Sequence, residues 1–371
     1  MKFKLNVPNL LRPFPTLAVG AALLVTALPT SAATATPGAP GPEMKSVLDQ
    51  FAKLDPKPLE SLSPQEARKQ PSPADAVKRI AMKPGAPSPR PEAVGENDDY
   101  QIPGAAGEIK VRVYTPKGTG PFPVVLYFHG GGWVIADLDT YDASARALTN
   151  AAQAVVVSAH YRQAPEHKFP AAHDDALAAY KWVLGHQEKL KGNGQVAVAG
   201  ESAGGNLAAA LCMMVRDQNL PAPVHQLLIY PVTDSKFDTP SYRENAQAKP
   251  LSKAGMEWFF KHAATSSTMN DPRLAILRAE NFRGLPAATV ITAQIDPLRS
   301  EGQAYAEKLK GAGVPVSYRN FEAVTHEFFG MGAVVPKAKE AQMFAGENLR
   351  RAFETGAGAA TGRSSTERTK R

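Results

Sequence analysis

The chain has 371 residues, of which 43% are hydrophobic, and a formal net charge of +7. This is enough for one large domain with a well-formed core, plus shorter appendages. The charge lies mainly at the two ends, with +3 in residues 1–33 and another +3 from residue 356 onward. The remainder is nearly neutral, which argues against a nucleic-acid-binding surface.

Residues 1–33 have the pattern of a secretory signal peptide. Three basic residues precede an apolar run at 16–28 that is too short to cross a bilayer. Small residues follow, and cleavage is expected after Ala33, with Ala35 as the second choice. An uncleaved membrane anchor is the alternative. We therefore expect a secreted or periplasmic protein without stable membrane insertion.

Residues 34–95 are expected to form a proline-rich linker followed by helices. Apolar residues recur at helical spacing over 46–54. Ser63 and Pro64 have the pattern of a helix start, with the serine as the cap. The prolines between Met82 and Pro91 predict an extended segment.

Strands alternate with helices over residues 96–355, the expected main domain. Strands are predicted at 109–114, 123–128, 154–159, 195–199, 226–230, 288–293 and 316–321. Helices are predicted at 139–152, 170–186, 203–218, 252–263, 300–312 and 337–353. This alternation is typical of an α/β fold, with a mostly parallel sheet and helices on both faces. The small, polar and basic tail at 356–371 is expected to be disordered.

The most informative motif is Gly200-Glu201-Ser202-Ala203-Gly204. It follows an apolar strand and precedes a predicted helix, which is the setting of a nucleophile elbow. The glycines permit a sharp turn that exposes the serine hydroxyl, while the amide of Ala203 faces the position where negative charge would develop. An ordinary glycine-rich turn is the alternative.

A second motif, His129-Gly130-Gly131-Gly132-Trp133, follows another apolar strand. Three glycines can present several backbone amides to the oxyanion of a tetrahedral intermediate. A phosphate-binding loop is the alternative, but the residues that such loops require are missing from this run. We therefore expect an oxyanion loop.

Together these motifs resemble those of the hormone-sensitive-lipase branch of the α/β-hydrolases, the esterases with an HGGG motif. The resemblance covers about residues 45–350, through the segments 129–140, 161–166, 169–175, 200–205 and 296–299 and His326. It implies an α/β-hydrolase fold. It also implies that an insertion at about 232–270 forms a helical cap with the N-terminal helices.

Nucleophilic catalysis by serine needs a histidine base and an acid that orients it, in the chain order Ser, Asp/Glu, His. Of the histidines after Ser202, His326 follows the last predicted strand, at the end of the sheet where ligands bind. The alternatives are His225, which precedes a strand, and His262, which lies in the insertion. Asp296 follows a strand and is the expected acid; the alternatives are Asp234, Asp238 and Asp271, which belong to the insertion.

The resemblance carries the oxyanion donors over to the amides of Gly131, Gly132 and Ala203, with Gly130 as a further candidate. His129 is expected to brace the glycine loop. Three residues depart from the pattern of many relatives: Glu201 in place of Asp, Ser300 in place of an acid, and Glu327 in place of Gly. We expect Glu327 to put a carboxylate near His326 and to raise its pKa.

The sequence therefore predicts a serine carboxylesterase that forms an acyl-enzyme and uses no metal or organic cofactor. The resemblance implies acyl esters of short to medium chain as small-molecule substrates. An amide or peptide hydrolase and a non-catalytic small-ligand receptor on the same scaffold are the alternatives. The single cysteine, Cys212, is expected to be a buried core residue. The oligomeric state, including a homodimer, is left open.

Overall fold

The computed structural model describes residues 1, 2, 4, 38–83, 85 and 91–367, with side chains up to residue 356. The chain divides into a unit at 1–35 and a unit at 36–371, and the second contains the fold described below. Most of the expected signal peptide and most of the segment 82–91 lie outside the described residues. Within the described ranges, none of the helices combines the length and the hydrophobicity that a membrane span requires.

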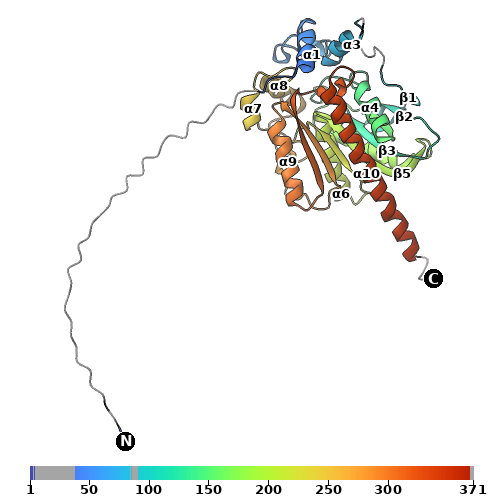
Figure 1. Ribbon diagram of the computed structural model, residues 1–371, viewed down its shortest axis with the longest axis vertical. Coiled ribbons are helices and arrows are strands. Elements are labelled where there is room, and N and C mark those ends of the chain that lie inside the picture. Colours follow the sequence, from blue (N-terminus) through green and yellow to red (C-terminus); the bar gives the residue numbers. More distant parts are fainter. Residues whose placement is uncertain (3, 5–37, 84, 86–90, 368–371) are drawn as a thin grey trace. The chain divides into compact units, whose positions relative to one another are not determined.

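An eight-stranded sheet forms the centre of the second unit (Figure 1). The strands are β1 (Glu96–Gly104), β2 (Gly107–Thr115), β3 (Phe122–Phe128), β4 (Val155–His160), β5 (Gly192–Glu201), β6 (Gln226–Ile229), β7 (Ala288–Ile295) and β8 (Val316–Thr325). Their order is β1-β2-β4-β3-β5-β6-β7-β8. β2 pairs antiparallel with β1 and β4, and the other neighbours are parallel. The predicted α/β class is confirmed, as are all seven predicted strands.

The strand β1 is missing from the sequence prediction. It begins with the polar run Glu96-Asn97-Asp98-Asp99 and buries only Ile102. It lies at the edge of the sheet and pairs with β2 alone. Charged residues are common on edge strands because they discourage pairing with another chain. Hydrophobic alternation therefore cannot reveal such a strand.

The central parallel strands are buried on both faces, and this explains their nearly continuous apolar sequences. On one face, residues such as Leu126 and Val198 pack with α5 (Ala171–Gly185), α6 (Ala203–Asp217) and α9 (Arg299–Gly311). On the other, Val125 and Ala197 pack with α4 (Asp142–Ala152) and α10 (Pro336–Glu367). The predicted helices in these positions are confirmed, with small differences at their ends.

The helix α10 is longer than the sequence predicts. The sequence predicts an end at residue 353 and disorder from residue 356, whereas the backbone is helical to Glu367. The disorder of the tail stays a prediction. Extending an existing helix needs no new nucleus, so residues with a weak helical tendency can follow a well-packed helix. Amino-acid composition alone does not reveal this cooperative stabilisation of the helix.

The N-terminal region forms α1 (Pro42–Ala52), the short 3-10 turn η1 (Leu59–Ser61), α2 (Pro64–Ala67) and α3 (Pro73–Ala81). The predicted cap at Ser63 is confirmed, because its hydroxyl accepts from the amide of Glu66 while the Glu66 carboxylate accepts from the amide of Ser63. Arg68 ties this region to the main domain through an ion pair with Glu166 and a hydrogen bond to the carbonyl of Val134.

The insertion between β6 and β7 contains α7 (Pro240–Glu244), α8 (Lys253–Ala263) and η2 (Ile276–Arg278). Its helix α8 contacts η1, and the indole of Trp258 donates to the carbonyl of Leu62 at 3.0 Å. The two segments that the resemblance assigns to a cap therefore lie side by side. After β8 the chain forms η3 (Phe328–Met331) before α10 begins.

The turn from β5 into α6 predicts a steric test. A Cβ atom on Gly204 would lie 2.0 Å from the carbonyl oxygen of Phe128 on β3, whereas one on Gly185 would meet nothing within 4 Å. We expect Gly204→Ala to lower the free energy of unfolding by about 1–3 kcal/mol or more. Gly185→Ala is the control and should change it by less than about 1 kcal/mol. Urea denaturation measures both, and equal losses would contradict the close contact.

Candidate active site

Ser202 lies at the sharp turn between β5 and α6. Its backbone has φ of 56° and ψ of −118°, a strained conformation for a residue with a side chain. Gly200 permits the turn, because a Cβ there would lie 2.1 Å from the carbonyl oxygen of Gly204. The amide of Ser202 donates to the carbonyl of Ile229 on β6 at 2.9 Å. The turn therefore holds the hydroxyl at the carboxyl end of the sheet.

The three residues predicted to form a triad come together in the structure. The Oγ of Ser202 lies 3.0 Å from Nε2 of His326, and Nδ1 of His326 lies 2.7 Å from Oδ2 of Asp296. The other oxygen of Asp296 accepts from the amide of Leu298 at 2.8 Å. All three side chains are buried. Ser202 follows β5, Asp296 follows β7 and His326 follows β8. These strands are parallel, and their carboxyl ends lie at the same edge of the sheet.

The alternative residues have other partners. His225 bonds to the hydroxyl of Thr289 at 2.8 Å, and the ring of His262 packs against Trp258. Asp234 pairs with Arg278 and Asp271 with Arg273. Asp238 supplies a backbone carbonyl to Arg243. Among the described residues, His326 is therefore the histidine that contacts Ser202, and Asp296 is the aspartate that contacts His326.

The glycine loop is held by its carbonyl groups. The hydroxyl of Tyr161 donates to the carbonyls of His129 at 2.9 Å and Gly130 at 3.2 Å. The carbonyl of Gly131 accepts from the amides at 134 and 135. Gly131 and Gly132 have φ values of 95° and 57°, which glycine adopts without strain. These contacts turn the loop so that Gly131 and Gly132 line the same cavity as Ser202.

The predicted amide donors divide into two groups. In the described part of the chain, the amides of Gly131, Gly132 and Ala203 donate to no protein oxygen. Gly130, by contrast, does not line the cavity and is packed beneath Tyr141, whose hydroxyl would lie 2.2 Å from a Cβ at that position. Gly131, Gly132 and Ala203 are therefore the donors left available for an oxyanion.

His129 braces this loop. Its Nδ1 lies 2.8 Å from the carbonyl oxygen of Gly130 and its Nε2 lies 3.0 Å from Nδ1 of His160. Burial, together with the charge of His160, lowers the pKa of His129 to about 3. The ring is therefore neutral near pH 7 and serves as a hydrogen-bonding support.

Negative charge surrounds His326. Burial alone would lower its pKa, but the charge and hydrogen bond of Asp296 and the charge of Glu327 outweigh that cost and raise it. Oε1 of Glu327 lies 3.7 Å from Nε2 of His326, the position that the sequence predicts. Glu201 is also buried, and its pKa is raised to about 7 by burial and by the charge of Glu327.

Ser300, the third departure from the family pattern, lies outside the site. It exchanges hydrogen bonds with Ser241, with its hydroxyl accepting at 3.1 Å and its amide donating at 3.0 Å. The next residue, Glu301, is buried and accepts from the amide of Thr233 at 2.7 Å. This contact holds the start of the insertion against α9. Sequence reasoning missed it because the two residues are distant in the chain.

A cavity of about 520 Å³ lies over Ser202 and His326. Much of its wall comes from the N-terminal region and the insertion, through apolar side chains such as Phe51, Leu59 and Leu251. Phe259 of α8 packs against the glycine loop, because a Cβ on Gly132 would lie 2.1 Å from its ring. An apolar cavity with a few convergent polar groups suits a small and mainly apolar ligand.

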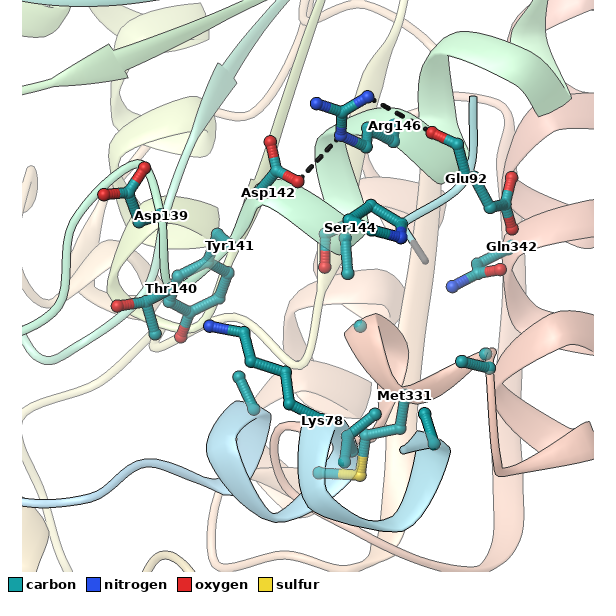
Figure 2. A pocket seen from close by; sticks show the side chains of 18 of the residues that line it. Lys78, Glu92, Asp139, Thr140, Tyr141, Asp142, Ser144, Arg146, Met331 and Gln342 are labelled. Carbon is teal, nitrogen blue, oxygen red and sulfur yellow. Dashed lines mark hydrogen bonds and ion pairs between the residues drawn. The ribbon is translucent and has the colours of Figure 1, made fainter. Parts of the chain in front are cut away.

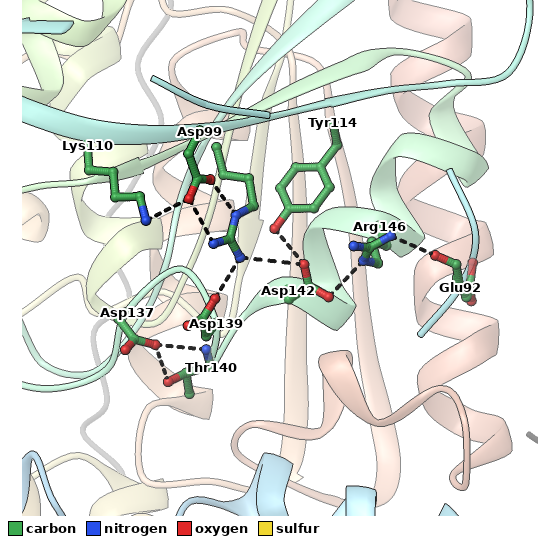
Figure 3. Close-up of polar contacts among 10 residues, drawn as sticks. Glu92, Asp99, Lys110, Tyr114, Asp137, Asp139, Thr140, Asp142 and Arg146 are labelled. Carbon is green, nitrogen blue, oxygen red and sulfur yellow. Dashed lines mark hydrogen bonds and ion pairs between the residues drawn. The ribbon is translucent and has the colours of Figure 1, made fainter. Parts of the chain in front are cut away.

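A chain of ion pairs fixes the segment between the glycine loop and α4 (Figure 3). Arg112 on β2 binds Asp99 at 2.6 Å and Asp139 at 2.7 Å. Asp142 accepts from the hydroxyl of Tyr114 at 2.8 Å and pairs with Arg146 at 2.7 Å. These contacts hold the residues on both sides of Tyr141, a residue that no local sequence pattern marks as part of the site.

The comparisons with known proteins agree with this geometry. Residues 125–330 match a protein family whose description is the α/β hydrolase fold. The chain is 42% identical to the carboxylic ester hydrolase LipN of Mycobacterium tuberculosis, over 66% of this chain and 67% of that protein. It is 34% identical to an ethyl acetate hydrolase of Pseudomonas putida, over 79% of this chain and 91% of that protein.

Solved structures give the same result. A thermostable esterase from Pseudomonas putida superimposes with a TM-score of 0.77 and 34% identity, over 85% of this chain and 98% of that one. The esterase of the archaeon Pyrobaculum calidifontis does so with a TM-score of 0.76 and 34% identity, over 84% and 98%. Fold, sequence and relatives agree that the chain belongs to the carboxylic ester hydrolases of the α/β-hydrolase fold that are related to hormone-sensitive lipase.

Proposed function

We propose that Ser202, His326 and Asp296 carry out ester hydrolysis through an acyl-enzyme. His326 takes the proton of Ser202 as the hydroxyl attacks the ester carbonyl, and then gives that proton to the departing alcohol. Asp296 keeps the imidazole in the required tautomer and stabilises its charged form. Water activated by the same histidine releases the acid and restores Ser202. The unbroken chain of contacts at 3.0 and 2.7 Å carries this proposal.

The amides of Gly131, Gly132 and Ala203 would bind the negative oxygen of the tetrahedral intermediate. They are already oriented by the loop and by the start of α6, so no reorganisation is needed when charge develops. The positive φ values at the two glycines and the carbonyl contacts made by Tyr161 support this role.

The substrates that we propose are acyl esters of short to medium chain. The cavity of about 520 Å³ and its apolar wall support a small acyl group. Relatives named for ethyl acetate hydrolysis and for arylesterase activity agree with small esters. An amide hydrolase is the remaining competitor among enzymes, because the same triad can cleave amides. A panel of matched esters and amides separates the two.

We also propose that the mature protein is exported, on the basis of the signal-peptide pattern in residues 1–33. N-terminal sequencing of the protein recovered outside the cytoplasm should begin at residue 34 or 36. A protein recovered only inside the cell and beginning at Met1 would contradict export.

The direct test of the proposed function is Ser202→Ala. Loss of the nucleophile should lower kcat on p-nitrophenyl acetate by about 10⁴-fold or more and abolish the burst of acyl-enzyme formation. Circular dichroism and the melting temperature serve as controls for folding. A folded Ser202→Ala protein with undiminished hydrolysis would rule the proposal out.

The bracing of the glycine loop gives a second test. Tyr161→Phe removes the donor to the carbonyls of His129 and Gly130, and we expect kcat/KM to fall about 10-fold because the amide donors shift. Tyr180→Phe is the matched control, because that hydroxyl is also buried but donates to the carbonyl of Pro221 at 2.7 Å. The control should lose stability and keep its kcat/KM. Equal kinetics in the two variants would argue against the bracing role.

A further inference from the structure

Two glutamates stand next to the proposed catalytic residues in the sequence. Glu201 precedes Ser202 and is 1% exposed. Its Oε1 accepts from the hydroxyl of Tyr127 at 2.6 Å, and its Oε2 accepts from the hydroxyl of Tyr230. Its carboxyl group is thus buried and held on both oxygens by hydroxyl donors.

Glu327 follows His326 and has a φ of 69°, a conformation that glycine adopts more easily. The contacts of its carboxylate explain why a residue with a longer side chain occupies this strained backbone conformation. Oε1 accepts from the hydroxyl of Tyr141 at 2.7 Å and lies 3.7 Å from Nε2 of His326. The residue therefore joins the histidine to the side chain that covers Gly130.

Both glutamates act on the same imidazole. Glu327 faces His326 directly, and Glu201 holds Tyr230, whose ring centre lies 4.5 Å from that of His326. Both glutamates also line a second and larger cavity of about 1480 Å³. Figure 2 shows Tyr141 and Ser144 in the wall of that cavity. That cavity gives a route by which protons can exchange with solvent.

The cations of the larger cavity do not bond to these two groups, although Lys78, Arg112, Arg146 and Lys339 line it. In the described parts of the chain, no lysine or arginine forms a hydrogen bond or ion pair with either glutamate. The titratable groups that face them from the packed elements are Tyr127, Tyr141, Tyr161, Tyr230, Asp296 and His326, and Ser144 lies beside Glu201. Burial raises the pKa of both carboxyl groups. Two buried carboxyl groups whose charges repel each other, and to which no lysine or arginine is bonded, cannot both ionise freely.

We propose that Glu201 and Glu327 are positioning residues that share one proton near pH 7 and so keep a single negative charge beside His326. The proton lies on one or the other carboxyl group, and the ionised partner carries the charge. This inference rests on the proposed role of His326 as the general base. A shared proton and two independently ionised carboxylates predict different effects when each glutamate is substituted.

The proposal fixes the sign and the pattern of the pH dependence. Negative charge favours the charged imidazole, so the pair raises the pH below which His326 is protonated and inactive as a base. If one glutamate becomes glutamine, the other releases the shared proton and the single charge remains. The acid limb of kcat/KM should then move little. If both become glutamine, the charge is lost, and the limb should move to lower pH by about 1 unit.

The experiment compares kcat/KM for p-nitrophenyl acetate between about pH 5 and 9 in wild type, E201Q, E327Q and E201Q/E327Q, with the products quantified chromatographically. The expected result is a shift in the double variant that exceeds the sum of the single shifts. E301Q is the matched control, because Glu301 is equally buried but accepts from the backbone amides of Thr233 and Asp234 and has no contact with His326. Its acid limb should coincide with that of wild type. Additive shifts, or no shift in the double variant, would overturn the proposal.

Infrared difference spectra supply a readout that does not depend on activity. Wild type near pH 7 should show the C=O stretch of one protonated carboxyl group that loses most of its intensity in either single variant, while the bands of carboxyl groups common to both proteins cancel. A band that persists in one or both single variants would show that the proton is not shared. If wild type hydrolyses no ester, the proposed function fails, and these spectra still decide whether the pair exists.

Discussion

The site depends on one close approach between two backbone segments. The first turn of α6 lies so near the end of β3 that a Cβ at Gly204 would fall 2.0 Å from the carbonyl oxygen of Phe128. The same approach brings the amide of Ala203 and the hydroxyl of Ser202 to the glycine loop that continues from β3. A strained φ at Ser202 accompanies this arrangement. The parallel sheet supplies the rigidity that keeps the conformation, because the amide of Ser202 is bonded to the next strand, β6.

Electrostatics add a second constraint. Asp296 and the pair formed by Glu201 and Glu327 lie around a buried imidazole, and their negative charge outweighs the cost of burying a cation there. Tyrosine hydroxyls, together with backbone amides, occupy the carboxylate oxygens. Hydrogen bonds of this kind stabilise the ionised form of a carboxyl group without transferring a proton to it. The site is therefore prepared for the positive charge that an imidazolium carries during acyl transfer.

Much of the fold and site could be predicted because local patterns encode them. Continuous apolar runs mark β3 and β5, and each is followed by a glycine motif that has few structural uses. The position of His326 after the last strand distinguishes it from the other two histidines that follow Ser202. These features are local in sequence, and a parallel sheet brings the carboxyl ends of its strands together whatever lies between them.

The remaining features depend on contacts between distant residues. Tyr141 and Tyr161 act through partners that single-sequence patterns do not connect; Tyr141 meets Glu327, 186 residues away. β1 is a polar edge strand, so its place in the sheet comes from pairing with β2 and not from burial. The length of α10 reflects propagation from a packed helix. In each case the deciding contribution to stability comes from tertiary contacts or from cooperative helix extension, and amino-acid composition does not reveal it.

The most direct test of the central claim is covalent labelling with an alkyl phosphonate ester, followed by tryptic digestion and mass spectrometry. The claim is that Ser202 alone is activated by His326 beside the amides of the glycine loop. It predicts one phosphonyl group on the peptide spanning residues 192–216, with no labelling of Ser202→Ala. A label on a different residue, or an unlabelled but fully active protein, would contradict it.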